Sequence, residues 1–448
     1  MRRVRSVGVM FLTFILVYIT GKIFIELENR PNDVKIFNLL RDVSVPEAIG
    51  LSANTHVSER FVHNVRCDEL MKGSKSEIEK AKKIMQNKNY TRKAISDYDY
   101  IQLTQNCDKF KLDRKYNMHI SEEEKQISVA YSILLYKDVE QAERLFRAIY
   151  SPNNLYCFHV DANSNQSIHE AVDGIAKCFD NVIVVSRKEY VVYSGFTRLQ
   201  ADLNCMSDLL RMEQKWDYFI NLPSQQFPLK TNAEIAKILK IYNGANDIEG
   251  ITGNRRLAHR FTFRHIYKEE PMKNTKLRPF KLNQKKEDPP FNITVVKGSA
   301  YGIFSRDFVN FVINSYQART ILDWFHDVLS PDEYYWATLN YNHQLEAPGS
   351  SFYKGVPDKK PWLAVFVAWG GADSCAGRFV RGICIFGVGD LHLLKEKPQL
   401  FSNKFYLDYQ PLALDCMEEW HRNRSMAGLS SDFNSTFYKS LPFIKPSS

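Results

Sequence analysis

The chain has 448 residues, of which 44% are apolar and 13% aromatic, so it can bury a large core. This composition excludes a disordered chain and a single small module. The net charge of +9 suits an anionic partner such as a nucleotide diphosphate or a membrane surface, whereas the lack of a dense Lys/Arg stripe with interleaved aromatics argues against nucleic acid.

The N-terminus carries a targeting signal. Three arginines, at positions 2, 3 and 5, precede an apolar run that extends, with one break, over residues 7–27. This is about the length of a bilayer span, and the positive charges before it favour a cytoplasmic tail at 1–6. A cleaved signal peptide is the alternative, but no small-x-small cleavage site follows the run. We therefore predict an uncleaved transmembrane signal-anchor, short enough for a thin membrane early in secretion.

After the anchor, residues 28–65 are mixed and polar, without a sustained periodicity. They are interpreted as a stem that holds the following domain away from the membrane. A short charged helix is predicted over 75–87.

From about residue 125, apolar runs alternate with amphipathic segments. This alternation predicts an α/β fold with a mixed, mainly parallel sheet flanked by helices, which binds ligands beyond the carboxyl ends of its strands. No G-x-G-x-x-G or P-loop follows the first strand, which disfavours an ordinary dinucleotide or ATP fold. Strands are predicted over 127–136, 155–160, 182–186 and 218–222, and helices over 138–150, 168–178, 198–211 and 232–242.

Eight cysteines follow the anchor without a tight C-x-x-C pair, which argues against structural zinc. An even number of cysteines behind a secretory signal indicates disulfides, although their count leaves the pairing open. Five N-x-S/T sequons support the same compartment, at Asn89, Asn165, Asn292, Asn423 and Asn434.

Six short segments carry a more specific signal. They are YCFHVD at 156–161, QADLNC at 200–205, GSAY at 298–301, SPDEYYWAT at 330–338, CIFG at 384–387 and NKF at 403–405. Their order and spacing resemble those of the core 2 β-1,6-N-acetylglucosaminyltransferase family, from about Cys67 to Cys416. The resemblance implies a GT-A type fold, a transfer that inverts configuration at the sugar, and no need for a metal or other cofactor.

Inversion in one displacement needs a base on the acceptor hydroxyl, opposite the leaving UDP, and a carboxylate can be that base. By its place in the SPDE motif, Glu333 resembles the family's base. The same motif is also a good helix N-terminus, so Asp332 and Glu333 have a purely structural interpretation as well.

The resemblance also implies a site for a UDP-sugar donor. Arg381 and Lys404 match the cations that neutralise the diphosphate. The single Asp-x-Asp match, at 97–99, precedes the β/α region and is interpreted as a surface or capping feature, so no metal ligand is predicted. The positions that the resemblance assigns to the nucleoside are Leu134, Tyr136, Asp161 and Tyr193. Asp161 has an alternative interpretation as a turn residue, and Tyr193 has one as a core residue.

On the acceptor side the match is looser. Glu249 and Arg260 match positions that hold galactose and N-acetylgalactosamine, and Trp369 lies where the family's Trp-bearing loop is replaced. The family has a lysine between the positions of Glu249 and Arg260. In this chain it would fall near Leu257, and an arginine at 255 or 256 could take its place. Residues 223–226 (PSQQ) depart from a Cys-Gly-x-Asp pattern, so the acceptor and the donor sugar stay open.

Taken whole, the resemblance implies a single-pass type II Golgi membrane enzyme whose lumenal catalytic domain covers 66–448. A nucleotide-binding half (about 125–250) would precede an acceptor-binding half (about 250–420). The enzyme would move GlcNAc from UDP-GlcNAc in β-1,6 linkage onto the GalNAc of core 1 O-glycans of glycoproteins. Another UDP-hexose or acceptor, an inactive glycan-binding protein, and a homodimer stay open. The implied disulfides are Cys67–Cys416, Cys107–Cys178, Cys157–Cys205 and Cys375–Cys384.

Overall fold

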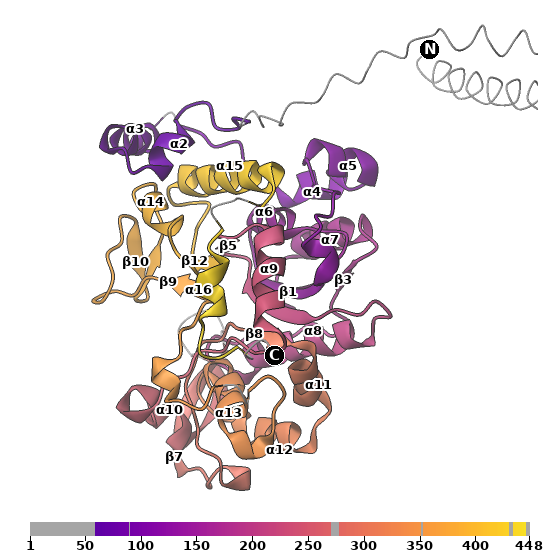
Figure 1. Cartoon of the computed structure of the whole chain (residues 1–448), viewed down its shortest axis with the longest axis vertical. Coiled ribbons are helices and arrows are strands. Elements are labelled where there is room, and N and C mark those ends of the chain that lie inside the picture. Colours follow the sequence, from indigo (N-terminus) through magenta and orange to yellow (C-terminus); the bar gives the residue numbers. More distant parts are fainter. Residues whose placement is uncertain (1–58, 89, 270–276, 351–352, 430–432, 445–448) are drawn as a thin grey trace, which may run out of the picture. The chain divides into compact units, whose positions relative to one another are not determined.

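The structure, a computed structural model, describes residues 59–88, 90–269, 277–350, 353–429 and 433–444. Within these ranges, no helix is both long and apolar enough to cross a bilayer. The predicted tail, the signal-anchor, most of the predicted stem and Asn89 lie outside the described residues. The chain from Ser58 onward is one compact unit (Figure 1).

A five-stranded sheet in the order β3-β2-β1-β4-β8 forms the centre of this unit (Figure 1). Strands β1 to β4 run parallel, and β8 joins β4 antiparallel at the edge. All seven residues of β1 are buried, as is typical of a parallel strand covered on both faces. The strands are β1 (Val129–Leu135), β2 (Leu155–Val160), β3 (Val182–Val184), β4 (Tyr218–Pro223) and β8 (Ile303–Ser305).

Helices cover both faces of the sheet. Helices α6, α7 and α9 pack on the face that holds the odd-numbered residues of β1, and α8 and α11 pack on the other face. There the hydroxyl of Ser132 donates to Asp202 of α8 at 2.9 Å. The predicted alternation of strands and helices is confirmed from β1 to α9, with ends that shift by about two residues. The helices are α6 (Val139–Ile149), α7 (Gln166–Lys177), α8 (Phe196–Arg211), α9 (Asn232–Tyr242) and α11 (Arg306–Asn314).

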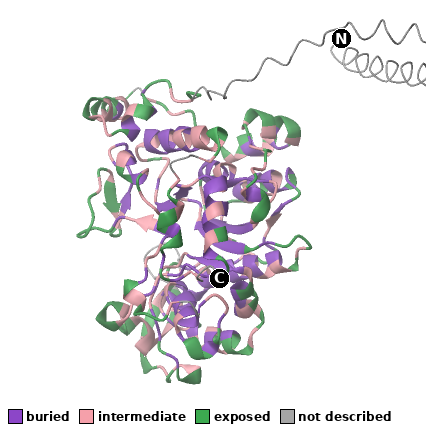
Figure 2. Cartoon of the chain, in the orientation of Figure 1, coloured by how far each residue is buried: buried purple, intermediate pink, exposed green. Residues whose placement is uncertain are grey.

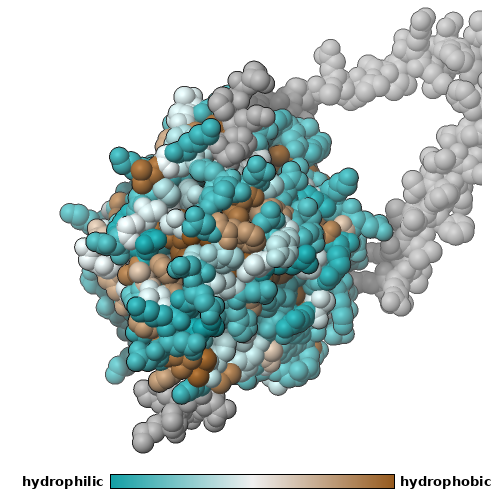
Figure 3. Space-filling model, turned by 90° about the horizontal axis from the view of Figure 1, so that it is seen from below, coloured by the Kyte–Doolittle hydropathy of each residue, from teal (hydrophilic) through white to brown (hydrophobic). Residues whose placement is uncertain are grey.

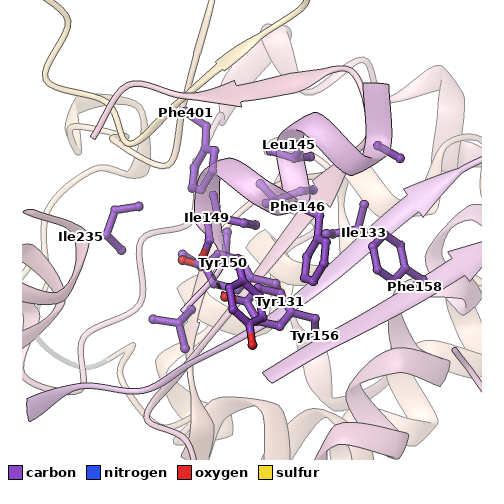
Figure 4. Close-up of a cluster of buried hydrophobic side chains, with 14 of the residues drawn as sticks. Tyr131, Ile133, Leu145, Phe146, Ile149, Tyr150, Tyr156, Phe158, Ile235 and Phe401 are labelled. Carbon is purple, nitrogen blue, oxygen red and sulfur yellow. Dashed lines mark hydrogen bonds between the residues drawn. The ribbon is translucent and has the colours of Figure 1, made fainter. Parts of the chain in front are cut away.

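Aromatic rings fill the core between β1, β2 and α6 (Figure 4). Tyr131 and Tyr156 are partners across β1 and β2, and their ring centroids stack 5.5 Å apart. Phe146 of α6 meets Tyr156 edge-on at 5.0 Å, an arrangement that aromatic pairs prefer. Buried residues concentrate around the sheet (Figure 2). This packing fixes the carboxyl ends of β1 and β2 in space.

The second half of the chain adds smaller sheets. A three-stranded sheet has the order β5-β12-β9, and β6–β7 and β10–β11 are two-stranded. The strands are β5 (Gln226–Pro228), β6 (Phe263–Glu269), β7 (Leu277–Lys285), β9 (Val365–Val367), β10 (Arg378–Val380), β11 (Ile383–Ile385) and β12 (Phe401–Asn403). The other helices are α2 (Cys67–Met71), α3 (Lys75–Gln86), α4 (Asp97–Leu103), α5 (Cys107–Asp113), α10 (His259–Thr262), α12 (Tyr316–Phe325), α13 (Tyr335–Tyr341), α14 (Leu391–Leu394), α15 (Pro411–Ala427) and α16 (Ser435–Lys439).

All eight cysteines are paired in disulfides. The first disulfide joins the start of α2 to α15 across 349 residues, and the last closes a loop with a separation of only 9. The pairs are those that the family resemblance implies: Cys67–Cys416, Cys107–Cys178, Cys157–Cys205 and Cys375–Cys384.

The end of the predicted stem packs on the domain. The backbone N–H groups of Phe61 and Val62 donate to the carboxylate of Glu419 on α15, at 2.6 and 2.9 Å. Val65 is fully buried. Residues from Phe61 onward therefore belong to the folded unit, because they satisfy a buried carboxylate and add to its core.

The described sequons differ in their surroundings. Asn165 and Asn292 are exposed, and Asn434 caps α16 by accepting from the N–H of Phe437 at 3.0 Å. Asn423 lies within α15, where its side chain exchanges two hydrogen bonds with the backbone of Glu59. A glycan on Asn423 would be attached to the same Nδ2 that donates to the carbonyl of Glu59.

Candidate functional site

The carboxyl ends of β1 and β2 place three of the predicted nucleoside residues at one edge of the sheet. Leu134 is buried near the end of β1, and Tyr136, which follows the strand, is 55% exposed. Asp161 follows β2, and its N–H donates to the carbonyl of Leu135 at 2.9 Å. Its Oδ1 accepts from the N–H of Asn163, so Asp161 also shapes a turn. Burial raises the pKa of Asp161.

Arg381 stands at the tip of the β10–β11 hairpin. Together with Gly382 it forms a two-residue turn in which both φ angles are positive, 51° and 77°, as in the hairpin turns that match strand twist. The guanidinium carbon of Arg381 lies 4.6 Å from the ring centroid of Tyr193. Because Tyr193 is 67% exposed, its interpretation as a core residue is wrong. The structure therefore brings two of the predicted donor residues together.

Lys404 follows β12 and approaches the edge that holds Tyr136. Its ammonium lies 5.2 Å from the ring centroid of Tyr406, and the ammonium of Lys137 lies 5.8 Å from the same ring. Lys137 also lies 6.0 Å from the ring of Tyr136. Tyr406 and Lys137 thus connect Lys404 to the end of β1, and neither was predicted from the sequence.

Glu333 ends the short 3-10 helix η4 (Pro331–Glu333). Its side chain is 32% exposed, so a substrate can reach it. The guanidinium of Arg260 donates to Oε2 at 2.8 Å, and the ammonium of Lys297 lies 3.1 Å from the same oxygen. Among the described residues, none hydrogen-bonds Oε1. The carboxylate is therefore held in one orientation by two cations while one oxygen stays open.

Glu249 adjoins this cluster, since its carbonyl lies against Gly298, the residue after Lys297. Burial raises the pKa of Glu249, the Lys297 ammonium opposes that shift, and the carboxylate of Glu333 adds to it. Ile251 and Lys297 exchange backbone hydrogen bonds, and the N–H of Gly298 donates to the carbonyl of Glu333 at 2.6 Å. Two carboxylates and two cations therefore converge, and the predicted residues Glu249, Arg260 and Glu333 belong to one site.

The two arginines considered as substitutes for the family's lysine serve elsewhere. Arg255 forms an ion pair with Asp358, and Arg256 donates to the carbonyl of Val295 at 3.2 Å. The lysine beside Glu333 is Lys297, which sequence reasoning missed. Its only signal was its place directly before the GSAY segment, because a lone lysine is ordinarily a solvated surface charge.

Trp369 lies apart from the Glu333 cluster in its described contacts. It is 52% exposed and pairs with Ile383 in an isolated bridge. The next residue, Gly370, donates its N–H to the carbonyl of Gly382 at 2.8 Å. Trp369 is therefore anchored beside the Arg381 hairpin.

The loop that carries Tyr193 links the two groups of residues. The N–H of Ser330, directly before η4, donates to the carbonyl of Ser194 at 2.7 Å. Tyr193 and Arg381 are thus tied through one backbone hydrogen bond to the turn that presents Glu333. The two groups are therefore adjacent in the fold.

A buried ionic layer supports this turn. Asp332 is buried, and burial raises its pKa to about 6 against the opposing charge of Arg198. Arg198 pairs with Asp202 at 2.7 Å, and its guanidinium carbon lies 5.8 Å from the ring of Tyr301. Of the two carboxylates in the SPDE motif, Glu333 is the one accessible to an acceptor.

The one Asp-x-Asp match, at residues 97–99, is predicted to be a surface or capping feature rather than a metal site. Asp99 forms a capping box with Ser96 at the start of α4, so its interpretation as a capping residue is confirmed. In the described ranges, the one group with metal-ligand spacing is Cys375, Cys384 and Asp390. Its two sulfurs form a disulfide and are therefore not the thiolates that bind metals.

Comparison with known proteins agrees with this arrangement. The Core-2/I-Branching enzyme family model matches residues 129–395. The chain is 37% identical over 407 residues to the beta-1,3-galactosyl-O-glycosyl-glycoprotein beta-1,6-N-acetylglucosaminyltransferase of Homo sapiens, over 88% of this chain and 93% of that relative. It is 35% identical to the relative of the same name from Bos taurus, over 88% of this chain and 94% of the relative. The Homo sapiens relative with the same name and the suffix 3 is 34% identical, over 82% of this chain and 84% of that relative.

Proposed function

The chain belongs to the Core-2/I-branching enzyme family, and from that premise we propose that it is a β-1,6-N-acetylglucosaminyltransferase. It moves GlcNAc from UDP-GlcNAc onto the GalNAc of core 1 O-glycans of glycoproteins. The relatives' names supply the donor sugar, the linkage and the acceptor class. The mixed, mainly parallel sheet flanked by helices suits a GT-A type fold.

The proposed chemistry is a single displacement with inversion. The acceptor's 6-hydroxyl gives its proton to Glu333 Oε1 while its oxygen bonds to the anomeric carbon of GlcNAc. The bond from that carbon to the UDP oxygen breaks at the same time, and UDP leaves with the bonding electrons. Arg381 and Lys404 supply positive charge for the diphosphate, as preorganised cations do in a transition state. Tyr136, Asp161 and Tyr193 hold the nucleoside.

One observation carries the proposal: Glu333 has one oxygen fixed by Arg260 and Lys297 and the other open. A protein that only binds glycans needs no accessible base held in this way. Incubation of the full-length chain with UDP-GlcNAc, UDP-glucose and UDP-galactose, each with a core 1 acceptor, tests it. We expect mass spectrometry to show one added GlcNAc. A product with only another hexose would overturn the donor assignment, and glycan binding without transfer or donor hydrolysis would overturn the enzyme.

Loss of the Arg381 guanidinium is expected to weaken UDP binding. A hydrogen bond to a charged group contributes about 1.5–3 kcal/mol, so Arg381→Ala should raise the Kd for UDP by roughly 10- to 100-fold. Titration calorimetry measures this change. Arg378→Ala on the same hairpin is the control, because Arg378 lies 4.2 Å over the ring of Tyr409. Equal effects of the two substitutions would show hairpin disruption rather than diphosphate binding.

Metal removal is expected to leave activity unchanged. We propose that Arg381 and Lys404 do for the diphosphate what a manganese ion does in Asp-x-Asp enzymes, because both are fixed cations. Transfer measured in excess EDTA should match transfer without chelator. Loss of activity with EDTA, followed by recovery with added manganese, would contradict this assignment.

The same proposal places the enzyme in the Golgi membrane as a single-pass type II protein. Residues 1–6 would be cytoplasmic, 7–27 the anchor, and the folded unit lumenal. Four disulfides support this location, since disulfides persist in oxidising compartments.

A further inference from the structure

One of the predicted sequons stands in a fixed turn of the surface. It comprises Asn292, Ile293 and Thr294, of which the middle residue is 5% exposed and the outer two are exposed. The side chain of Asn342 holds the backbone of Thr294, because it accepts from the N–H and donates to the carbonyl, both at 2.8 Å. Within the described ranges the side chain of Asn292 has no hydrogen-bond partner. Its amide nitrogen is therefore open to covalent modification, unlike that of Asn423.

The backbone of this turn is uncommon. The 3-10 helix η3 (Pro290–Asn292) ends in two residues with positive φ, 58° at Phe291 and 48° at Asn292. Asparagine adopts this conformation readily, whereas a bulky phenylalanine rarely does. The ring N–H of Trp324 donates to the carbonyl of Glu287 at 3.1 Å, so the segment that enters the turn is held against α12. Such an outlier is a reason to look for a function at the turn.

Two aromatic rings are exposed beside the sequon. Phe291 is 40% exposed, and Tyr316, the first residue of α12, is 69% exposed. Their ring centroids are 6.2 Å apart and their planes meet at 81°, so each ring is held edge-on by the other. We call these two residues the aromatic pair. The end of the molecule where α12 lies shows hydrophobic residues in small groups among hydrophilic ones (Figure 3). A surface as small as two rings suits one sugar rather than a protein partner.

We propose that the aromatic pair binds the first N-acetylglucosamine of an N-linked glycan that Asn292 carries. The ring faces attract the polarised C–H groups of a pyranose, while its hydroxyls stay in water. The first sugar is bonded to the side chain that directly follows Phe291, so it is the sugar held nearest to the pair. The bound glycan would cover both rings and stabilise the segment that leads to Lys297. The inference rests on the lumenal placement that is part of the proposed function.

Two substitutions of Thr294 separate the effect of the glycan from that of the protein. Thr294→Val removes the sequon and keeps Asn292 in its turn, whereas Thr294→Ser is the matched control that keeps the sequon. The full-length chain is produced in secretory eukaryotic cells, with tyrosine or serine at position 316. We expect glycopeptide mass spectrometry to find Asn292 occupied only where the sequon is kept. With Tyr316 in place, loss of the glycan should lower the midpoint of thermal unfolding by about 2 °C, the scale of one weak contact. In the Tyr316→Ser chain this difference should disappear, because the two changes then no longer couple.

Tyr316→Phe is the rescue, because it keeps the ring, and it should restore the difference in midpoint. Equal losses with tyrosine and serine at position 316 would overturn the inference. It would also be overturned by an unoccupied Asn292 in a chain whose Asn165 or Asn434 carries a glycan. If none of these three sequons is occupied, the lumenal placement fails and the inference fails with it. A lower mass of the chain in solution after Tyr316→Ser would overturn it too, by assigning the aromatic pair to a contact between copies.

Discussion

Replacing Glu333 by Gln is expected to lower kcat by at least about 100-fold, because general-base catalysis typically contributes that factor or more. The amide keeps the shape of the carboxylate and can still accept from Arg260. It cannot take the proton of the acceptor hydroxyl. Binding of UDP should change little, since the described contacts of Glu333 are with Arg260 and Lys297 rather than with the diphosphate cations. Steady-state kinetics with a core 1 acceptor measures the first effect, and calorimetry measures the second.

Glu396→Gln is the matched control, because the Glu396 side chain is 74% exposed and its ion pair is with Lys395. It should leave kcat and UDP affinity unchanged. If Glu333→Gln keeps most of its activity, Glu333 is only part of a turn and the base lies elsewhere. If activity and UDP affinity fall together, the substitution has disturbed the Tyr193 loop as well, because the hydrogen bond between Ser330 and Ser194 joins that loop to the Glu333 turn.

Removal of the disulfide between Cys67 and Cys416 is expected to destabilise the folded chain strongly. The bond closes a loop of 349 residues between buried sulfurs. In the chain-entropy model, such a loop restricts the unfolded state by on the order of 5 kcal/mol. Cys67→Ala/Cys416→Ala should therefore shift the urea unfolding midpoint far downward, as followed by tryptophan fluorescence.

Cys375→Ala/Cys384→Ala gives the comparison, because that bond spans a separation of only 9. The same entropic relation assigns it about 2–3 kcal/mol. A shift as large as that of the long loop would show that local packing around the sulfurs outweighs chain entropy.

The sheet could be predicted from sequence because of how buried parallel strands are built. β1, β2 and β4 are covered on both faces, so each is a nearly continuous apolar run. The helices between them show the period of an amphipathic surface. The hairpin β6–β7 was not predicted, because β7 has only intermediate and exposed residues and contains Pro279, without the apolar alternation of a half-buried strand.

Site residues could be predicted where they belong to a local sequence motif. Residues that join the site only through contacts between distant segments could not. Glu333 and Arg260 are 73 positions apart, and Glu249 belongs with them through Lys297. No local sequence pattern indicates that Glu333 and Arg260 form a pair. Lys297 has no such pattern either, because a lysine before a glycine is commonly a surface residue. The same holds for Lys137 and Tyr406, which reach each other only because the ends of β1 and β12 lie close together.

The most direct test of the central claim is the structure of the product. The full-length chain is incubated with UDP-GlcNAc and a core 1 disaccharide, and the trisaccharide is examined by two-dimensional NMR. The account predicts a GlcNAc anomeric proton with β configuration and a through-bond correlation to carbon 6 of GalNAc. An α anomer would contradict inversion at Glu333, and a correlation to any other carbon of the acceptor would contradict the proposed branching reaction.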